Sequence, residues 1–298
     1  NIKLMNIEYH LNELEDKGYT IIPNVIDDYE ILEYIDEFNK WMDSIENIDY
    51  LHDIIHYNGI FKYFQVGHQR FAWLIRTNKK VQNIFKKIWN TDELVVSFDG
   101  CCYYPNKYTC DDRYWIHSDQ SPLKKGKHCI QSFISMTNNK EKTFIVYEGS
   151  HKLHAQYSTY YNLNHASDWL PIKKEFIKSI ENKKKILYIK KGSMVLWDSR
   201  TFHQNTCGPP ESIEDRLVQY LCFLPKNSIY NDEVEQEIRK NYFENYITTN
   251  HFPYPMARIS DQPLHYNTYN PESPIYIDNS KLKKPILHDL LPEIYKLL

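Results

Sequence analysis

The chain has 298 residues, and 42% of them are apolar, which is enough to bury a sizeable core in one or at most two domains. The 36 Lys and Arg residues nearly balance the 39 Asp and Glu residues, so the formal net charge is −3. A chain without excess positive charge is a poor match for nucleic-acid phosphates, so we expect no nucleic-acid partner. No apolar run reaches the roughly 18 residues that cross a bilayer, and residues 1–19 are too polar and acidic for a signal peptide. We therefore expect a soluble, cytoplasmic protein with no membrane partner.

The six cysteines contain no C-x-x-C pair, which argues against a zinc site or a disulfide framework and favours a reducing compartment. The eight glycines form neither a G-x-G-x-x-G nor a G-x-x-x-x-G-K pattern. The usual backbone cradles for dinucleotides and nucleoside triphosphates are therefore missing, and nucleotide-dependent chemistry is disfavoured.

Helical periodicity marks residues 7–17 and 27–45, and a short strand is predicted between them at 19–23. A further short helix is predicted at 82–89, after which short β-type runs follow one another, separated by turn residues. These runs are residues 94–98, 101–104, 114–116, 129–136, 143–147, 185–189, 193–197 and 217–224. Short β segments without intervening helices of βαβ length favour an antiparallel sandwich or barrel, flanked by the N-terminal helices.

Pro, Tyr and Asn become frequent from residue 225 onward, where helices are predicted only at 232–246 and, as a short closing helix, after Pro285. The closing helix carries an apolar stripe that packs on its own domain or binds a partner: Ile286, Leu287, Leu290, Leu291, Ile294 and Leu297. We expect one domain made of an N-terminal helical support (1–92), a β core (93–225) and a C-terminal extension (226–298). The sequence leaves the oligomeric state open.

Three residues that follow β runs have the types and spacing of a metal site. His117 and Asp119 are two residues apart, so both side chains point to the same side of an extended chain. His203 comes after the apolar run 193–197, and opposite the pair it completes a two-histidine, one-carboxylate triad. Such a triad suits Fe(II) and leaves adjacent coordination positions open. Arg216 opens a later β run, where its planar guanidinium suits a carboxylate.

Each candidate also has a structural interpretation. His117 and Asp119 could be a hydrogen-bonded pair at a strand end, and His203 a histidine of the core. Arg216 could instead form a surface ion pair with the neighbouring Glu214 or Asp215.

Two further groups of residues are weaker candidates. Gln131 and Tyr104 lie on predicted strands and could make polar contacts with a cofactor or substrate. A basic cluster could meet an anionic substrate or form a solvated loop: Lys124, Lys125 and Lys127.

Taken in order, several motifs resemble the phytanoyl-CoA dioxygenase (PhyH) family of Fe(II)/2-oxoglutarate-dependent oxygenases. LEDKGYTIIPNVI at 14–26 is similar to the opening segment of that family, and WIHSDQSP carries its H-x-D motif. GSH at 149–151 matches a characteristic turn, KKGSMVLWDSRTFHQN carries the distal histidine, and TTNHFP at 248–253 resembles a segment of bacterial relatives. Arg216 matches the basic residue that holds the far carboxylate of 2-oxoglutarate. The chain departs from the family at Val218, where many members have Ser, and at Glu148, where Pro is usual.

The resemblance implies a mainly β fold with flanking helices, a double-stranded β-helix (jelly-roll, cupin-like) core and a C-terminal extension of helix and loop. It implies an enzyme that hydroxylates an unactivated C–H bond of a small molecule with Fe(II), 2-oxoglutarate and O2, releasing succinate and CO2. His117, Asp119 and His203 would be the metal-binding and catalytic residues. The residues implied to bind the cofactor are Arg216, Gln131 and Tyr104.

The intact Asp119 disfavours halogenation, because related halogenases replace this carboxylate with a small residue. Residues 154–184 and 246–276 would form the lid that selects the substrate. Two other hypotheses remain: a catalytically silent β-helix domain that serves binding or assembly, and a cupin-like metalloenzyme that does not use 2-oxoglutarate.

Overall fold

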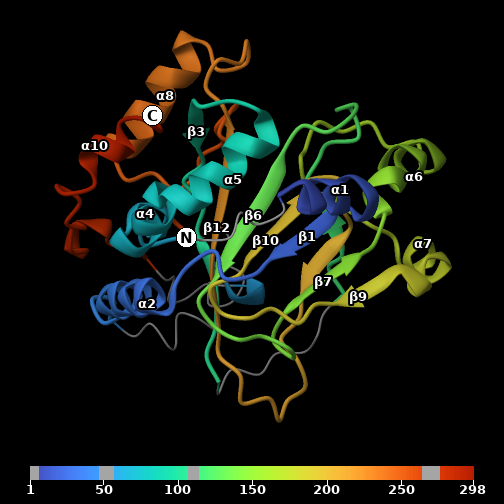
Figure 1. The fold of residues 1–298 in the computed structure, drawn as a ribbon, viewed down its shortest axis with the longest axis horizontal. Helices are drawn as coiled ribbons and strands as arrows, with labels where there is room; N and C mark the ends of the chain where they lie inside the picture. Colours follow the sequence, from blue (N-terminus) through green and yellow to red (C-terminus); the bar gives the residue numbers. More distant parts are fainter. Residues whose placement is uncertain (1–6, 47–56, 107–113, 264–275) are drawn as a thin grey trace. The chain divides into compact units, whose positions relative to one another are not determined.

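The computed structural model describes residues 7–46, 57–106, 114–263 and 276–298 (Figure 1). Its contacts divide the chain into two compact units, and each unit combines segments that are distant in sequence. The first unit comprises Asn1–Asn24 and Tyr104–Arg216, and the second comprises Val25–Tyr103 and Leu217–Leu298. This grouping differs from the three consecutive segments expected from the sequence, and the single domain stays a prediction.

The first unit contains three antiparallel strands in the order β1, β10, β6 (Figure 1). They are β1 (Tyr19–Ile22), β10 (Met194–Asp198) and β6 (Ile130–Ser135). Helix α1 (Ile7–Lys17) precedes β1 and contacts it. Every residue of β6 and β10 is buried. Strand β10 is a nearly continuous apolar run, whereas β6 also buries the polar residues Gln131, Ser132 and Ser135.

A second antiparallel sheet of the first unit has the order β8, β5, β11, β7, β9. Its strands are β8 (Leu170–Pro171), β5 (His117–Ser118), β11 (His203–Asn205), β7 (Phe144–Tyr147) and β9 (Lys184–Ile186). Two short helices lie in the connection between β7 and β9, namely α6 (His154–Tyr160) and α7 (Lys174–Ser179).

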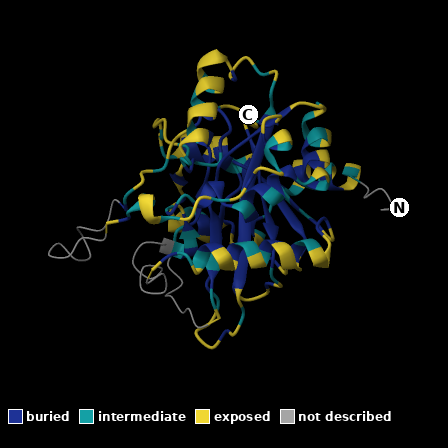
Figure 2. Cartoon of the chain, turned by 90° about the vertical axis from the view of Figure 1, so that its left-hand side faces the viewer, coloured by how far each residue is buried: buried dark blue, intermediate teal, exposed yellow. Residues whose placement is uncertain are grey.

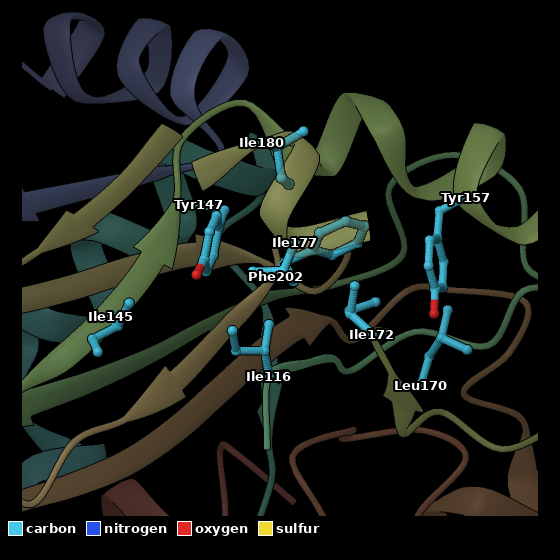
Figure 3. Packing of buried hydrophobic residues seen from close by; sticks show 9 residues of the cluster. All are labelled: Ile116, Ile145, Tyr147, Tyr157, Leu170, Ile172, Ile177, Ile180 and Phe202. Carbon is cyan, nitrogen blue, oxygen red and sulfur yellow. The ribbon is translucent and has the colours of Figure 1, made fainter. Parts of the chain in front are cut away.

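An apolar cluster joins this sheet to the two short helices (Figure 3). Ile116 and Phe202 belong to the cluster, and each immediately precedes a candidate metal ligand. Because successive side chains of extended chain point to opposite sides, burying these two directs His117 and His203 to the other face. The remaining members are Ile145, Tyr147, Tyr157, Leu170, Ile172, Ile177 and Ile180.

The second unit combines short strands with most of the helices. The long strand β12 (Arg216–Pro225) pairs with β3 (Leu94–Val96) and lies next to β4 (Cys101–Tyr104), which pairs with β2 (Ile60–Phe61). Its helices are α2 (Asp28–Met42), α4 (Arg70–Thr77), α5 (Lys79–Trp89), α8 (Glu233–Glu244) and α10 (Leu291–Ile294).

Side chains at the N-termini of two of these helices fix where the helices begin. Asn78 accepts a hydrogen bond from the backbone of Lys80 at the start of α5, and Asp232 accepts one from Glu235 at the start of α8. Figure 2 shows the strands mainly as buried and the helices with both buried and exposed residues. None of the described helices combines the length and the apolar character that a membrane span needs.

The prediction of a mainly antiparallel β structure with helices is confirmed. Several element bounds were wrong. Helix α4 was not predicted, and the strand expected at 114–116 lies at His117–Ser118. Helices α6 and α7, which were not predicted either, lie within the expected lid segment 154–184. The closing helix is confined to Leu291–Ile294. The other expected lid segment, 246–276, lies partly outside the described residues.

Candidate metal centre

The structure brings His117, Asp119 and His203 together. Strands β5 and β11 pair so that the two histidines stand opposite each other, with ring centroids 4.4 Å apart. The Nε2 atom of His117 lies 3.4 Å from Oδ1 of Asp119, and Nε2 of His203 lies 3.2 Å from Oδ2. One ligand atom from each of the three buried residues falls within 4.8 Å of the others, so the group could hold a metal ion.

The hydrogen bonds of the two imidazoles determine which nitrogen faces the centre. Nδ1 of His117 lies 2.9 Å from the Trp115 carbonyl, and Nδ1 of His203 lies 2.8 Å from the Thr201 carbonyl. A carbonyl oxygen can only accept, so Nδ1 donates this hydrogen bond in both rings and Nε2 is the nitrogen that faces the centre. Metal-binding histidines are oriented in the same way, by a hydrogen bond from the other ring nitrogen.

Gln131 orients the carboxylate of the triad. Its side-chain amide nitrogen donates to Oδ2 of Asp119 at 3.0 Å, whereas its amide oxygen is buried and finds no hydrogen-bond partner within residues 7–46, 57–106, 114–263 and 276–298. The sequence suggested Gln131 as a cofactor contact, and the structure places it beside Asp119, a candidate metal ligand. Tyr104 is buried at the end of β4, and its role stays a prediction.

Aromatic rings line the face that carries the triad. The rings of Phe144 and Trp197 lie 5.2 Å and 5.6 Å from that of His203, and Trp115 stacks on His117 at 4.9 Å. The indole N–H of Trp115 donates to the Asn205 carbonyl, but the buried indole N–H of Trp197 has no partner in the part of the chain that the structure describes. A buried donor without a partner is costly, so this atom is suited to bind a ligand.

Arg216 is a buried cation with free hydrogen-bonding capacity. Its side chain is 0% exposed, and Nη2 donates to Oδ1 of Asn205 at 2.9 Å. Its Nε and Nη1 atoms are buried without a hydrogen-bond partner among the described residues, and the guanidinium lies 5.4 Å from the Phe133 ring. A buried guanidinium with open N–H groups is a charged donor suited to a carboxylate.

The surface ion pair considered for Arg216 is wrong. The Glu214 carboxylate accepts the backbone N–H groups of Lys140, Glu141 and Lys142, while the Asp215 carboxylate accepts that of Asn106. Both acidic groups are therefore engaged elsewhere, and Arg216 is fully buried.

Asn205 connects the arginine to the triad. It lies two residues after His203 on β11, so both side chains point to the same face, roughly 6.6 Å apart along the strand. Because Asn205 holds the guanidinium, Arg216 faces the same side of this sheet as the metal ligands. Sequence reasoning missed Asn205, although its H-x-N spacing from His203 was a visible signal.

Other candidate residues have structural roles. Nε2 of His151, in the G-S-H turn, donates to the Glu15 carbonyl, and burial lowers the pKa of this histidine. Lys124 forms an ion pair with Asp168 at 2.7 Å, which weakens the case for an anion site on its loop. Cys101 is buried in the core, and burial raises the pKa of its thiol.

The donor set fits a borderline divalent metal. Two neutral imidazoles and one carboxylate form the facial triad that is typical of non-heme Fe(II), and a closed zinc site would need a fourth protein ligand. The fit rests on two observations: both imidazoles donate through Nδ1, so that both Nε2 atoms face the centre, and Gln131 fixes the carboxylate.

Comparison with known proteins gives one sequence relative and several fold relatives. No family model matches the chain. The chain is 29% identical over 266 residues to Ava biosynthesis cluster protein O of Aspergillus versicolor, covering 82% of this chain and 85% of that protein.

Two solved structures share the fold at 14% sequence identity. One is GlcNAc Inducible Gene 2, GIG2 (DUF1479), of Candida albicans, with a TM-score of 0.61 over 96% of this chain and 73% of that chain. The other is the epimerase SnoN in complex with Fe3+, alpha ketoglutarate and nogalamycin RO, with a TM-score of 0.52 over 74% of this chain and 83% of that chain.

Proposed function

We propose that this protein is an Fe(II)- and 2-oxoglutarate-dependent dioxygenase of the phytanoyl-CoA dioxygenase type, built on a double-stranded β-helix. The observation that carries the proposal is one face that combines a buried His117, Asp119 and His203 triad with the open guanidinium of Arg216. The fold shared with SnoN, whose complex contains Fe3+ and alpha ketoglutarate, supports it.

The reaction we propose is hydroxylation of an unactivated C–H bond in a small-molecule substrate. The substrate, 2-oxoglutarate and O2 give the hydroxylated product, succinate and CO2, so that one oxygen atom enters the product and the other enters succinate. O2 is the oxidant of this reaction; when bound, iron would supply the site for O2 activation, and 2-oxoglutarate would supply two of the four electrons that O2 accepts.

The residues of the chain would bind the metal and 2-oxoglutarate and orient them. His117, Asp119 and His203 would hold the metal through Nε2, a carboxylate oxygen and Nε2, while Gln131 keeps the carboxylate in place. Arg216, held by Asn205, would bind the distal carboxylate of 2-oxoglutarate with its open N–H groups.

Trp197 supplies the second contact that the family usually obtains from Ser at the position of Val218. Its indole N–H is the unpartnered buried donor beside His203, and its ring lies 5.8 Å from the Phe133 ring, on which Arg216 rests. The surrounding rings exclude water, which strengthens each polar contact to the bound 2-oxoglutarate.

The first test is anaerobic addition of Fe(II) and 2-oxoglutarate to the purified protein, with detection of the visible charge-transfer band of the chelated keto acid. We expect the band in the wild type, its loss in His117→Ala, and a need for at least ten-fold more 2-oxoglutarate in Arg216→Ala. His128→Ala is the control, because His128 is exposed and lies outside the triad. An iron-loaded wild type without the band would refute the oxygenase and favour a binding or assembly protein.

A further inference from the structure

One large aromatic side chain beside the candidate metal centre, that of Trp169, is partly exposed to solvent. The Trp169 ring lies 5.8 Å from the His117 ring at an interplanar angle of 34°, yet Trp169 remains 50% exposed. Its indole N–H has no hydrogen-bond partner among the described residues. Trp115, the other tryptophan beside His117, differs because its indole N–H is bound to a backbone carbonyl. The stacking of Trp115 alone accounts for support of the imidazole, so the exposed indole of Trp169 is available for another contact.

The backbone around Trp169 is firmly anchored. The next residue, Leu170, is 1% exposed, belongs to the apolar cluster of Figure 3, and pairs with Ser118 between the two metal ligands of the H-x-D motif. The preceding residue, Asp168, accepts the backbone N–H of Ser121 at 2.9 Å. An exposed aromatic ring on a fixed backbone can bind a ligand without a large loss of conformational entropy.

A second exposed apolar side chain lies on the loop that is clamped to the same residue. Leu123 is 57% exposed, and the next residue, Lys124, forms its ion pair with Asp168. The loop is also held by Gln120, whose side-chain amide donates to the carbonyls of Lys124 and Gly126. Leu123 and Trp169 therefore belong to two segments that are tied together next to Asp119. We call these two residues the apolar rim.

The two segments meet at an ion pair, and the exposed Lys125 and Lys127 follow on the same loop. The Lys124 ammonium and the Asp168 carboxylate neutralise each other at the point where the two segments meet. An indole face and a leucine side chain provide apolar area and no hydrogen-bond acceptor. A flat conjugated ring is the group whose shape and polarity match an open indole face, because offset stacking adds to the burial of apolar surface.

We propose that the apolar rim of Trp169 and Leu123 binds an aromatic or conjugated ring system of the substrate next to the metal ligands. This inference rests on the proposed function, because it takes the metal centre as the place of reaction. It assigns the substrate to a chemical class: small molecules with a planar ring close to the carbon that is oxidised.

The test measures binding of a planar probe by isothermal titration calorimetry under anaerobic conditions, with the protein loaded with Fe(II) and 2-oxoglutarate. The probe is 2-naphthol, and trans-2-decalol is its saturated, non-planar counterpart. We expect the wild type to bind 2-naphthol at least five-fold more tightly than the decalol. Trp169→Ala should weaken 2-naphthol binding at least five-fold, and Trp169→Phe less than two-fold, because phenylalanine keeps a flat ring.

Tyr160→Ala is the matched control, since Tyr160 is an exposed aromatic residue (76%) on α6 and should leave naphthol binding unchanged. The charge-transfer band of Trp169→Ala should match the wild type, which shows that the variant is folded and that its metal centre is intact. Equal naphthol binding in wild type and Trp169→Ala, equal binding of the two probes, or no binding to the wild type would each overturn the inference. If the band is absent but naphthol binding depends on Trp169, the proposed function fails and the ring-binding site stands.

Discussion

Replacing Arg216 by methionine tests whether this arginine serves ligand binding or the stability of the fold. Without a ligand, the two unpartnered N–H groups of Arg216 each cost about 1–3 kcal/mol. The hydrogen bond to Asn205 contributes about 1.5–3 kcal/mol, and the contact with the Phe133 ring about 0.5–2 kcal/mol. These effects nearly cancel, and methionine is flexible enough to fill the space.

We therefore expect the free energy of unfolding of Arg216→Met to stay within about 1 kcal/mol of the wild type when 2-oxoglutarate is absent. Removing one partner of a buried ion pair would instead cost about 3–5 kcal/mol. At a 2-oxoglutarate concentration 100 times its Kd, the wild type should gain about 2.7 kcal/mol. The variant should gain less than about 1 kcal/mol, because it has lost the carboxylate contact.

The assay is urea-induced unfolding of the Fe(II)-loaded protein under argon, with and without 2-oxoglutarate. Arg239→Met is the matched control: Arg239 is also fully buried, but it donates to the carbonyls of Pro253 and Leu298. We expect this variant to lose about 2–3 kcal/mol and to keep its stabilisation by 2-oxoglutarate. The reasoning is refuted if Arg216→Met loses 3 kcal/mol or more without 2-oxoglutarate, or if 2-oxoglutarate stabilises it as much as the wild type.

Three further predictions test other parts of the structure. Trp197→Phe removes the unpartnered indole N–H and should raise the Kd for 2-oxoglutarate about five- to ten-fold, measured from the charge-transfer band. An unchanged Kd would exclude a contact between Trp197 and 2-oxoglutarate. Burial lowers the pKa of His68 to about 3, below the unfolded value of about 6.5, so its stabilising effect is present above pH 6.5 and is lost as the pH falls towards 3. Between pH 6.5 and 5 the wild type should lose about 2 kcal/mol more than His68→Phe in urea unfolding, and parallel losses would contradict the assignment. A Cβ on Gly18, at φ +81°, would meet the side chains of His151 and Thr201, whereas a Cβ on Gly126, at φ +75°, would meet open space. Gly18→Ala should therefore lower the free energy of unfolding by at least 2 kcal/mol more than Gly126→Ala. Equal shifts of the melting temperature in the two variants would contradict this prediction.

Much of the candidate site was already present in the order and spacing of residues. Four residues were proposed from the sequence alone: His117 and Asp119 of the H-x-D pair, the later His203, and Arg216. Each follows or opens an apolar β run, and the alternation of side chains along such a run determines the face to which its neighbours point. The mainly antiparallel fold also follows from these short runs, since their length and turn residues are local properties. Element bounds were less accurate: α4, α6 and α7 were missed, because short helices are stabilised mainly by packing against other segments.

The partners of the site residues are a tertiary property. Gln131 reaches Asp119 across 12 residues, Asn205 reaches Arg216 across 11, and the Trp169 ring meets that of His117 across 52 positions of sequence. Strand register determines the face to which each side chain points, since a shift by one residue would turn it to the opposite face. Packing between segments that are distant in sequence then brings the partners into contact. The sequence by itself determined which residues can bind a metal and a carboxylate, whereas the tertiary structure decided which polar atoms remain unpartnered and which aromatic ring stays open, because hydrogen-bond satisfaction and burial depend on neighbours that only folding brings together.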